Sequence, residues 1–141
     1  MNLILPLLLS QTFFLTLAAP QSNPPNNAHE ILGTWEGESQ CAVPDSPCHD
    51  EHVIYEIAAD KDSSSGLKMD GYKLVNGERQ FMGTLRCEYE AAKKNLACTS
   101  RGKNNDDWEY TLSGPTLQGT LTINAGKTLY RKITVKRNPT P

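Results

Sequence analysis

The chain has 141 residues, of which 14 are Lys or Arg and 16 are Asp or Glu, for a formal net charge of -2. Because the charges balance and no run of basic residues exceeds two, nucleic acid is not an expected partner. About 120 residues remain after an N-terminal signal segment, enough for one domain with one hydrophobic core.

The N-terminal segment is apolar and carries no charged side chain over residues 1–19, and the Pro/Asn-rich stretch "PQSNPPNNAHE" follows. This pattern predicts a secretory signal peptide at residues 1–18. Pro6 and the polar residues after it interrupt the apolar run, so no membrane span is expected. We therefore expect an exported protein, periplasmic or extracellular, whose mature chain starts with a flexible lead-in at residues 19–30.

From Ile31 onward, apolar residues occupy alternate positions in short runs, as Val53, Tyr55 and Ile57 do. This period of two predicts half-buried antiparallel strands rather than helices. The later sets expected to share an inward face are Phe81, Leu85, Cys87 and Tyr89; Trp108, Tyr110 and Leu112; Leu117, Leu121 and Ile123; and Leu129, Ile133 and Val135.

Turn-forming clusters separate these runs, and Asn76-Gly77 is the strongest hairpin signal among them. Eight strands joined only by short turns form a meander, which loses its exposed edges when it closes into a barrel. We therefore predict an all-β fold, an eight-stranded antiparallel up-and-down β-barrel over residues 31–137 with a C-terminal tail at 138–141. A two-sheet sandwich is the alternative. The expected strands are residues 32–40, 51–59, 67–75, 78–90, 95–101, 107–112, 116–123 and 128–137.

Four cysteines could pair in three ways. Proximity in the sequence favours Cys41 with Cys48, across a short loop, and Cys87 with Cys98, across the turn "EAAKKN". Export makes the oxidised state the expected one. In the chain-entropy model each bridge contributes about 2.5–3 kcal/mol by restricting the unfolded chain.

Two short motifs resemble those of the lipocalin and calycin barrels: "GTWEGES" at residues 33–39 and "LYRKITV", which contains Arg131. In that family a Trp on the first strand is covered by a basic side chain from the last strand. The resemblance therefore implies that Arg131 stacks over Trp35 and closes one end of the barrel. Alternation independently places Arg131 on the inward face with Ile133 and Val135. The whole chain also resembles small exported bacterial lipocalin-like proteins whose function is uncharacterised.

The stretch "SPCHDEH" at residues 46–52 contains side chains that bind metals. Cys48 is not available as a ligand if it pairs with Cys41, which leaves His49 and His52 as the candidate metal ligands. Residues three apart on a strand point to opposite faces, so these rings converge only if residues 49–50 are loop. We therefore expect a structural connection at the barrel rim, with no metal site and no cofactor.

Catalytic motifs are not evident in the sequence, which has no nucleophile elbow, HExxH motif or Gly-rich phosphate loop. Glu36, Glu38 and Glu51 could act as an acid/base set. However, Glu36 and Glu38 alternate with Trp35, which predicts that both face solvent. A protein without enzymatic activity is the interpretation that follows.

Inward aromatic residues either fill the barrel or line a ligand cavity. The short strands leave a limited interior, which favours packing, whereas the phenols of Tyr55 and Tyr110 indicate a cavity because buried hydroxyls need partners. We expect a monomeric, non-enzymatic lipocalin-like protein that binds a small, mostly apolar ligand at the open barrel end. The alternative is a protein-binding module, such as an inhibitor of a secreted hydrolase, acting through its N-terminal arm or the stapled loop 41–48. The candidate ligand-binding residues are Trp35, Tyr55, Phe81, Trp108, Tyr110 and Arg131.

Overall fold

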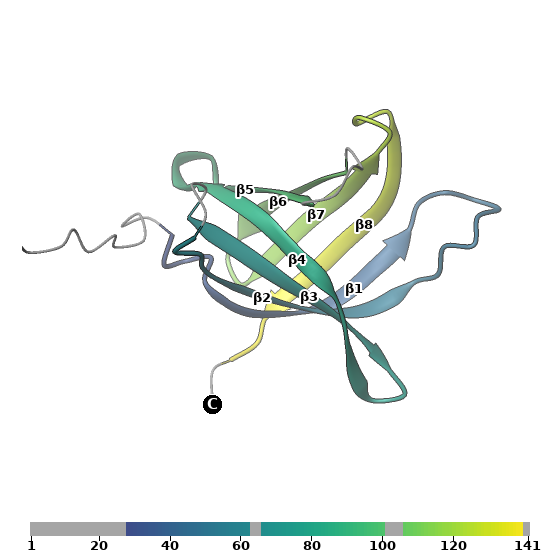
Figure 1. Ribbon diagram of the computed structural model, residues 1–141, viewed down its shortest axis with the longest axis horizontal. Helices are drawn as coiled ribbons and strands as arrows, with labels where there is room; N and C mark the ends of the chain where they lie inside the picture. Colours follow the sequence, from purple (N-terminus) through teal and green to yellow (C-terminus); the bar gives the residue numbers. More distant parts are fainter. Residues whose placement is uncertain (1–27, 63–65, 101–105, 140–141) are drawn as a thin grey trace, which may run out of the picture.

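The computed structural model describes residues 28–62, 66–100 and 106–139 and consists of eight antiparallel strands (Figure 1). Each strand pairs with the next along the chain, and the last pairs with the first, which closes the barrel. The predicted up-and-down barrel is confirmed, and the sandwich alternative is wrong. The strands are β1 (Gly33–Cys41), β2 (Glu51–Ala59), β3 (Leu67–Val75), β4 (Glu78–Glu90), β5 (Asn95–Ser100), β6 (Asp107–Ser113), β7 (Thr116–Ile123) and β8 (Thr128–Arg137).

Helical structure in the described part of the chain is limited to one 3₁₀ turn, η1 (Ala91–Lys93), between β4 and β5. Lys94 follows it in the left-handed conformation and donates its backbone N–H to the carbonyl of Ala91, at 3.2 Å. No helix among the described residues is long and apolar enough to cross a membrane.

The core occupies the barrel interior, because alternate residues of each strand point inward and the intervening polar residues face solvent. Trp35 and Tyr110 are the largest fully buried side chains. The other buried apolar residues in the cluster are Ala28, Ile31, Val53, Tyr55, Ile57, Leu67, Met69, Cys87, Leu96, Cys98, Leu112, Leu117, Ile133 and Val135.

One end of the barrel is closed by Trp35 and Arg137. The Trp35 indole donates from Nε1 to the carbonyl of Ile31 at 3.0 Å, and the Arg137 guanidinium lies 4.3 Å from the centre of the Trp35 ring. Arg137 also donates to the carbonyls of Leu32, at 2.6 Å, and Glu30. These contacts offset the cost of burying the positive charge of Arg137.

The family resemblance implied that Arg131 stacks over Trp35. The residue in that position is Arg137 instead. Both arginines lie on the inward face of β8, but the register pairs Trp35 with Arg137 and Cys41 with Arg131. Alternation correctly gives the face of Arg131, but it contains no information about which end of the barrel a residue occupies. Arg131 lies at the opposite end.

A turn at residues 28–31 packs against the closed end of the barrel. Ala28 and Ile31 are buried in the core, whereas residues 19–30 were expected to form a flexible lead-in. Glu30 accepts hydrogen bonds from the Tyr89 hydroxyl at 2.8 Å and from Lys94 Nζ at 2.5 Å, which fasten the turn to the barrel. Residues 1–27, including the predicted signal peptide and most of the lead-in, lie outside the described residues.

A β-bulge in the β3–β4 hairpin reverses the expected face of Phe81. Gly71 pairs with Gly83, but Tyr72 pairs with Phe81, so Met82 is an extra residue in β4. Since one extra residue reverses the alternation, Phe81 lies outside the barrel with 61% of its surface exposed. Its ring packs against Tyr72, with centroids 5.4 Å apart. The prediction that Phe81 shares the inward face of Leu85 is wrong.

A second bulge, between β7 and β8, has the same effect on Leu129. Leu121 pairs with Arg131, and Thr122 pairs with Leu129, so Tyr130 is the extra residue. Leu129 is consequently 38% exposed rather than inward with Ile133. The bulge precedes Arg131 in β8, so the alternation from Arg131 to Val135 is unaffected.

The two predicted disulfides, Cys41–Cys48 and Cys87–Cys98, are confirmed, and all four cysteines are paired. Cys87 and Cys98 are directly opposite each other on β4 and β5 and are fully buried, so this bridge belongs to the core. The other bridge closes the connection between β1 and β2.

Gly119 offers a test of packing in the core, because it pairs with Tyr110 and a Cβ there would lie 2.2 Å from Tyr110 Cδ1. We expect Gly119→Ala to lower the free energy of unfolding by about 1–3 kcal/mol through overpacking. Gly71→Ala is the matched control, since the nearest atoms to its Cβ are at 3.7 Å. Urea unfolding measures both, and equal effects of the two substitutions would contradict the prediction.

Candidate functional site

A cavity of about 260 Å³ opens at the end of the barrel opposite Trp35. All eight strands contribute to its lining. Since a water molecule takes about 30 Å³ in the liquid, the volume corresponds to roughly eight or nine waters. The cavity can therefore hold a small organic molecule but not a large one.

The walls of the cavity are mostly apolar. The β-bulge in β4 brings Met82 to the lining beside Gly71 and Gly83, where the missing side chains leave space. The half-buried indole of Trp108 contributes a flat aromatic surface. The other apolar side chains of the lining are Val53, Met69, Leu85, Leu121 and Ile133.

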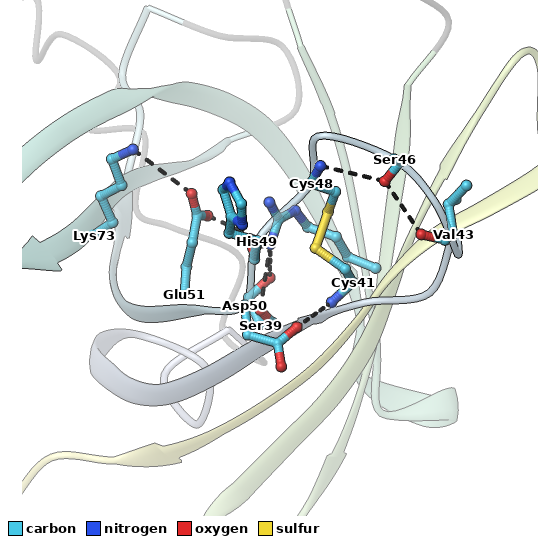
Figure 2. Close-up of a disulfide and its surroundings, with 10 residues drawn as sticks. Ser39, Cys41, Val43, Ser46, Cys48, His49, Asp50, Glu51 and Lys73 are labelled. Atoms are coloured by element: carbon cyan, nitrogen blue, oxygen red, sulfur yellow. Dashed lines mark hydrogen bonds and ion pairs between the residues drawn. A yellow bond between two sulfur atoms is a disulfide. The ribbon is translucent and has the colours of Figure 1, made fainter.

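Arg131 lies at the mouth of the cavity, with its side chain 13% exposed. Its Nη1 donates to the carbonyl of His49 at 3.1 Å and to both the carbonyl and the hydroxyl of Ser39 at 3.3 Å. The carboxylate of Glu51 is 3.5 Å from the same nitrogen. Glu51 also lies 3.6 Å from Lys73 Nζ. Figure 2 draws this ion pair as a dashed line.

Two tyrosines are neighbours inside the barrel, Tyr55 in the cavity lining and Tyr110 in the packed core. The rings of Tyr55 and Tyr110 meet edge to face with centroids 6.0 Å apart. Burial raises the pKa of Tyr55 to about 12, so its hydroxyl is protonated at neutral pH. Burial also raises the pKa of Tyr110 well above its usual value. The Tyr110 hydroxyl is buried without a hydrogen-bond partner in the described part of the chain.

The six candidate ligand-binding residues separate into three groups. Tyr55, Trp108 and Arg131 line the cavity, as expected. Trp35 and Tyr110 are buried in the packed core and are not part of the lining. The third group is Phe81 alone, on the outer surface for the reason given above.

Several lining residues were missed by the sequence prediction. Val53 and Ile133 carried a usable signal, since both were assigned to the inward face. Ser39 and Glu51 are the last and first residues of the β1–β2 pairing, and their role at the mouth depends on where the strands end. Met82 gave no signal, because only the bulge brings it to the cavity.

The disulfide loop between β1 and β2 forms one side of the rim, and its own polar groups hold it together (Figure 2). Asp50 Oδ1 accepts a hydrogen bond from the backbone N–H of Cys41 at 2.8 Å. Ser46 Oγ donates to the carbonyl of Val43 and accepts from the N–H of Cys48, each at 3.2 Å. The "SPCHDEH" stretch thus forms the end of a stapled loop and the start of β2.

The two histidines of this stretch do not converge. His49 is exposed in the loop, whereas His52 lies on the outer face of β2. Its Nε2 is 2.8 Å from Glu36 Oε1 and its Nδ1 is 2.7 Å from Glu38 Oε1. Glu36 and Glu38 therefore face outward, as predicted. Across residues 28–62, 66–100 and 106–139, no group of three His, Cys, Asp or Glu side chains is arranged to hold a metal ion.

His52 is held between two carboxylates, and both of its nitrogens can donate only when the ring is an imidazolium. The hydrogen bond to Glu36 and then that to Glu38 raise the pKa of His52 above its ordinary value of 6.5. The charged triad lies on the outside of the barrel, away from the cavity, and ties β2 to β1. It therefore acts on stability rather than on ligand binding.

The His52 triad predicts a dependence of stability on pH. Since its pKa is raised on folding, its stabilisation is fully present below 6.5 and is lost as the pH rises through the folded-state value. We expect His52→Gln to destabilise the protein at about pH 5.5 and to have little effect at about pH 9. Chemical denaturation at each pH measures this, with His49→Gln as the control. A His52→Gln effect that is equal at both pH values would contradict the prediction.

Comparison with known proteins does not assign this chain to a family. No protein-family model matches this chain, and no characterised protein is similar enough in sequence to count as a relative. The closed barrel, the two disulfides and the cavity are therefore the features on which a function can be based.

Proposed function

We propose that this protein is an exported, non-enzymatic lipocalin-like binding protein whose barrel takes a small, mostly apolar ligand. The cavity between Trp108 and Ile133 is the observation that carries the proposal. It is apolar within, polar at its mouth and open at one end, while Trp35 and Arg137 close the other end. These are the general features of small-molecule sites in barrels.

The size of the cavity limits the ligand and its affinity. A linear chain with seven methylene groups gains about 5–6 kcal/mol when it is fully buried, at about 0.8 kcal/mol per CH₂. Part of this gain offsets the entropy lost on association. A ligand of that size is thus expected to bind reversibly, which suits a carrier.

The remaining elements of the proposal also have support. Two disulfides are typical of proteins from oxidising compartments, which agrees with export directed by the predicted signal at residues 1–18. The charged side chains of the described lining, Glu51 and Arg131, are paired with each other, and Tyr55 titrates far above neutral pH. Since the carboxylate at the mouth is engaged in an ion pair, this arrangement favours binding over catalysis.

Filling the cavity tests the proposal. Ser100 lines the cavity at the end of β5, and the adjacent Thr99 is exposed on the outer face. We expect isothermal titration calorimetry to detect binding of n-octanol to the wild-type protein. Ser100→Phe should weaken this binding at least about tenfold, because the ring occupies the ligand volume. Thr99→Phe adds the same ring outside the barrel and should leave binding unchanged.

Two results would count against the binding function. Absence of n-octanol binding to the wild-type protein would contradict the proposed binding function. Equal binding of n-octanol by the Ser100→Phe and Thr99→Phe variants would show that n-octanol binds on the outer surface and not in the cavity. Urea unfolding of both variants verifies that each one is folded at the temperature of the titration.

A protein-binding function is the second candidate, favoured by the stapled loop. The connection between β1 and β2 extends beyond the body of the barrel (Figure 1), and Pro44, Asp45 and Pro47 are exposed on it. A loop stiffened by prolines and a disulfide loses little entropy on docking into the cleft of a secreted hydrolase. The N-terminal arm that could act similarly lies mostly outside the described residues.

Enzyme inhibition assays test this second function. Stoichiometric inhibition of a member of a panel of secreted metalloproteases and lysozymes, lost in a Pro44→Gly/Pro47→Gly variant, is the expected result. The variant should still bind n-octanol, because neither proline lines the cavity. Absence of inhibition across the panel, or inhibition that survives in the variant, would contradict a role for the loop.

A further inference from the structure

We propose that the ligand carries an anionic head group, most simply a carboxylate, which the Arg131 guanidinium and the Tyr55 hydroxyl bind at the mouth of the cavity. This inference rests on the proposed function and specifies the chemical class of its ligand. The apolar tail would point inward, toward Met69, Leu121 and Ile133.

Arg131 has N–H groups that are available to bind a ligand. Every hydrogen bond that it makes within the described residues starts from Nη1, and Nη2 and Nε have no acceptor there. A guanidinium has five N–H donors in a planar fork that matches the two oxygens of a carboxylate. Because the side chain is only 13% exposed, it is partly shielded from solvent, and a charge-assisted hydrogen bond to a ligand is stronger in such a place.

The charges at the mouth also favour an anion. Glu51 is shared between Arg131, at 3.5 Å, and Lys73, at 3.6 Å, and both distances are longer than direct hydrogen bonds. Taken together, these two cations and one carboxylate carry a net positive charge. An amine head group would meet this charge unfavourably, whereas an anion would reduce it.

Tyr55 supplies a further donor between the mouth and the apolar walls. It lines the cavity, and its hydroxyl lies near that of Tyr110. Arg131 and Glu51 both influence its titration, which places the hydroxyl within electrostatic reach of the mouth. Since it keeps its proton at neutral pH, it can donate to a ligand oxygen.

Three ligands with the same number of carbon atoms and different head groups test this inference. Isothermal titration calorimetry at about neutral pH compares octanoate, n-octanol and octylamine on the full mature protein. We expect octanoate to bind about tenfold more tightly than n-octanol, because hydrogen bonds to an ion are stronger, and octylamine to bind least. Equal binding of all three would overturn the inference and leave the carrier function intact. No binding of any would refute the carrier function as well.

Substitutions at the mouth identify the groups responsible. We expect Arg131→Gln to weaken octanoate binding about tenfold and to change n-octanol binding less than about twofold. Lys132→Gln is the matched control: it removes the same charge from the next residue of β8, which is exposed on the outer face, and should keep the preference for octanoate.

Tyr55→Phe provides a test that keeps the arginine and its ion pair. The substitution removes one hydroxyl, and we expect octanoate binding to weaken roughly threefold with n-octanol binding unchanged. This variant decides the matter if Arg131→Gln fails to fold, which near-UV circular dichroism reveals. A preference for octanoate that survives undiminished in each folded variant would overturn the inference.

Discussion

The pairing of β8 with β1 is the constraint on which the rest of this structure depends. It closes the barrel, and its register sets Arg137 opposite Trp35 and Arg131 opposite Cys41. One strand thereby delivers two inward cations to the two ends of the barrel. A cation inside a barrel must find partners, and the two ends meet this need differently. At the closed end, Arg137 contacts the carbonyls of Glu30 and Leu32 and the indole of Trp35. At the open end, Arg131 donates only from Nη1 to acceptors among the described residues.

The two ends of the barrel also differ in how they are packed. Gly33 has a positive φ of 119°, and a Cβ there would lie 3.1 Å from Arg137 Nη1, so the closed end is packed around its cation. The open end is shaped instead by what is missing: Gly71 and Gly83 leave space, and a bulge brings flexible Met82 to the lining. A filled end and a hollow end on the same barrel support the proposed binding of a small molecule.

Much of the candidate site could be predicted from alternation alone. Tyr55, Trp108 and Arg131 were expected to face inward, and all three line the cavity. Phe81 was assigned wrongly because a bulge leaves no mark in a single sequence, apart from a glycine such as Gly83 within a strand. Glu51 was considered only as an acid or base, since its position at the mouth depends on pairing between distant residues.

The sequence by itself determined the fold class, the eight strands to within a residue or so, and both disulfides. These features follow from local alternation, turn residues and proximity along the chain, which are all present in short segments. Only the tertiary structure decided which arginine covers Trp35, which side of the sheet holds Phe81, and where the interior is filled or empty. Those outcomes depend on register and on two bulges, and register is a relation between strands that no single strand encodes.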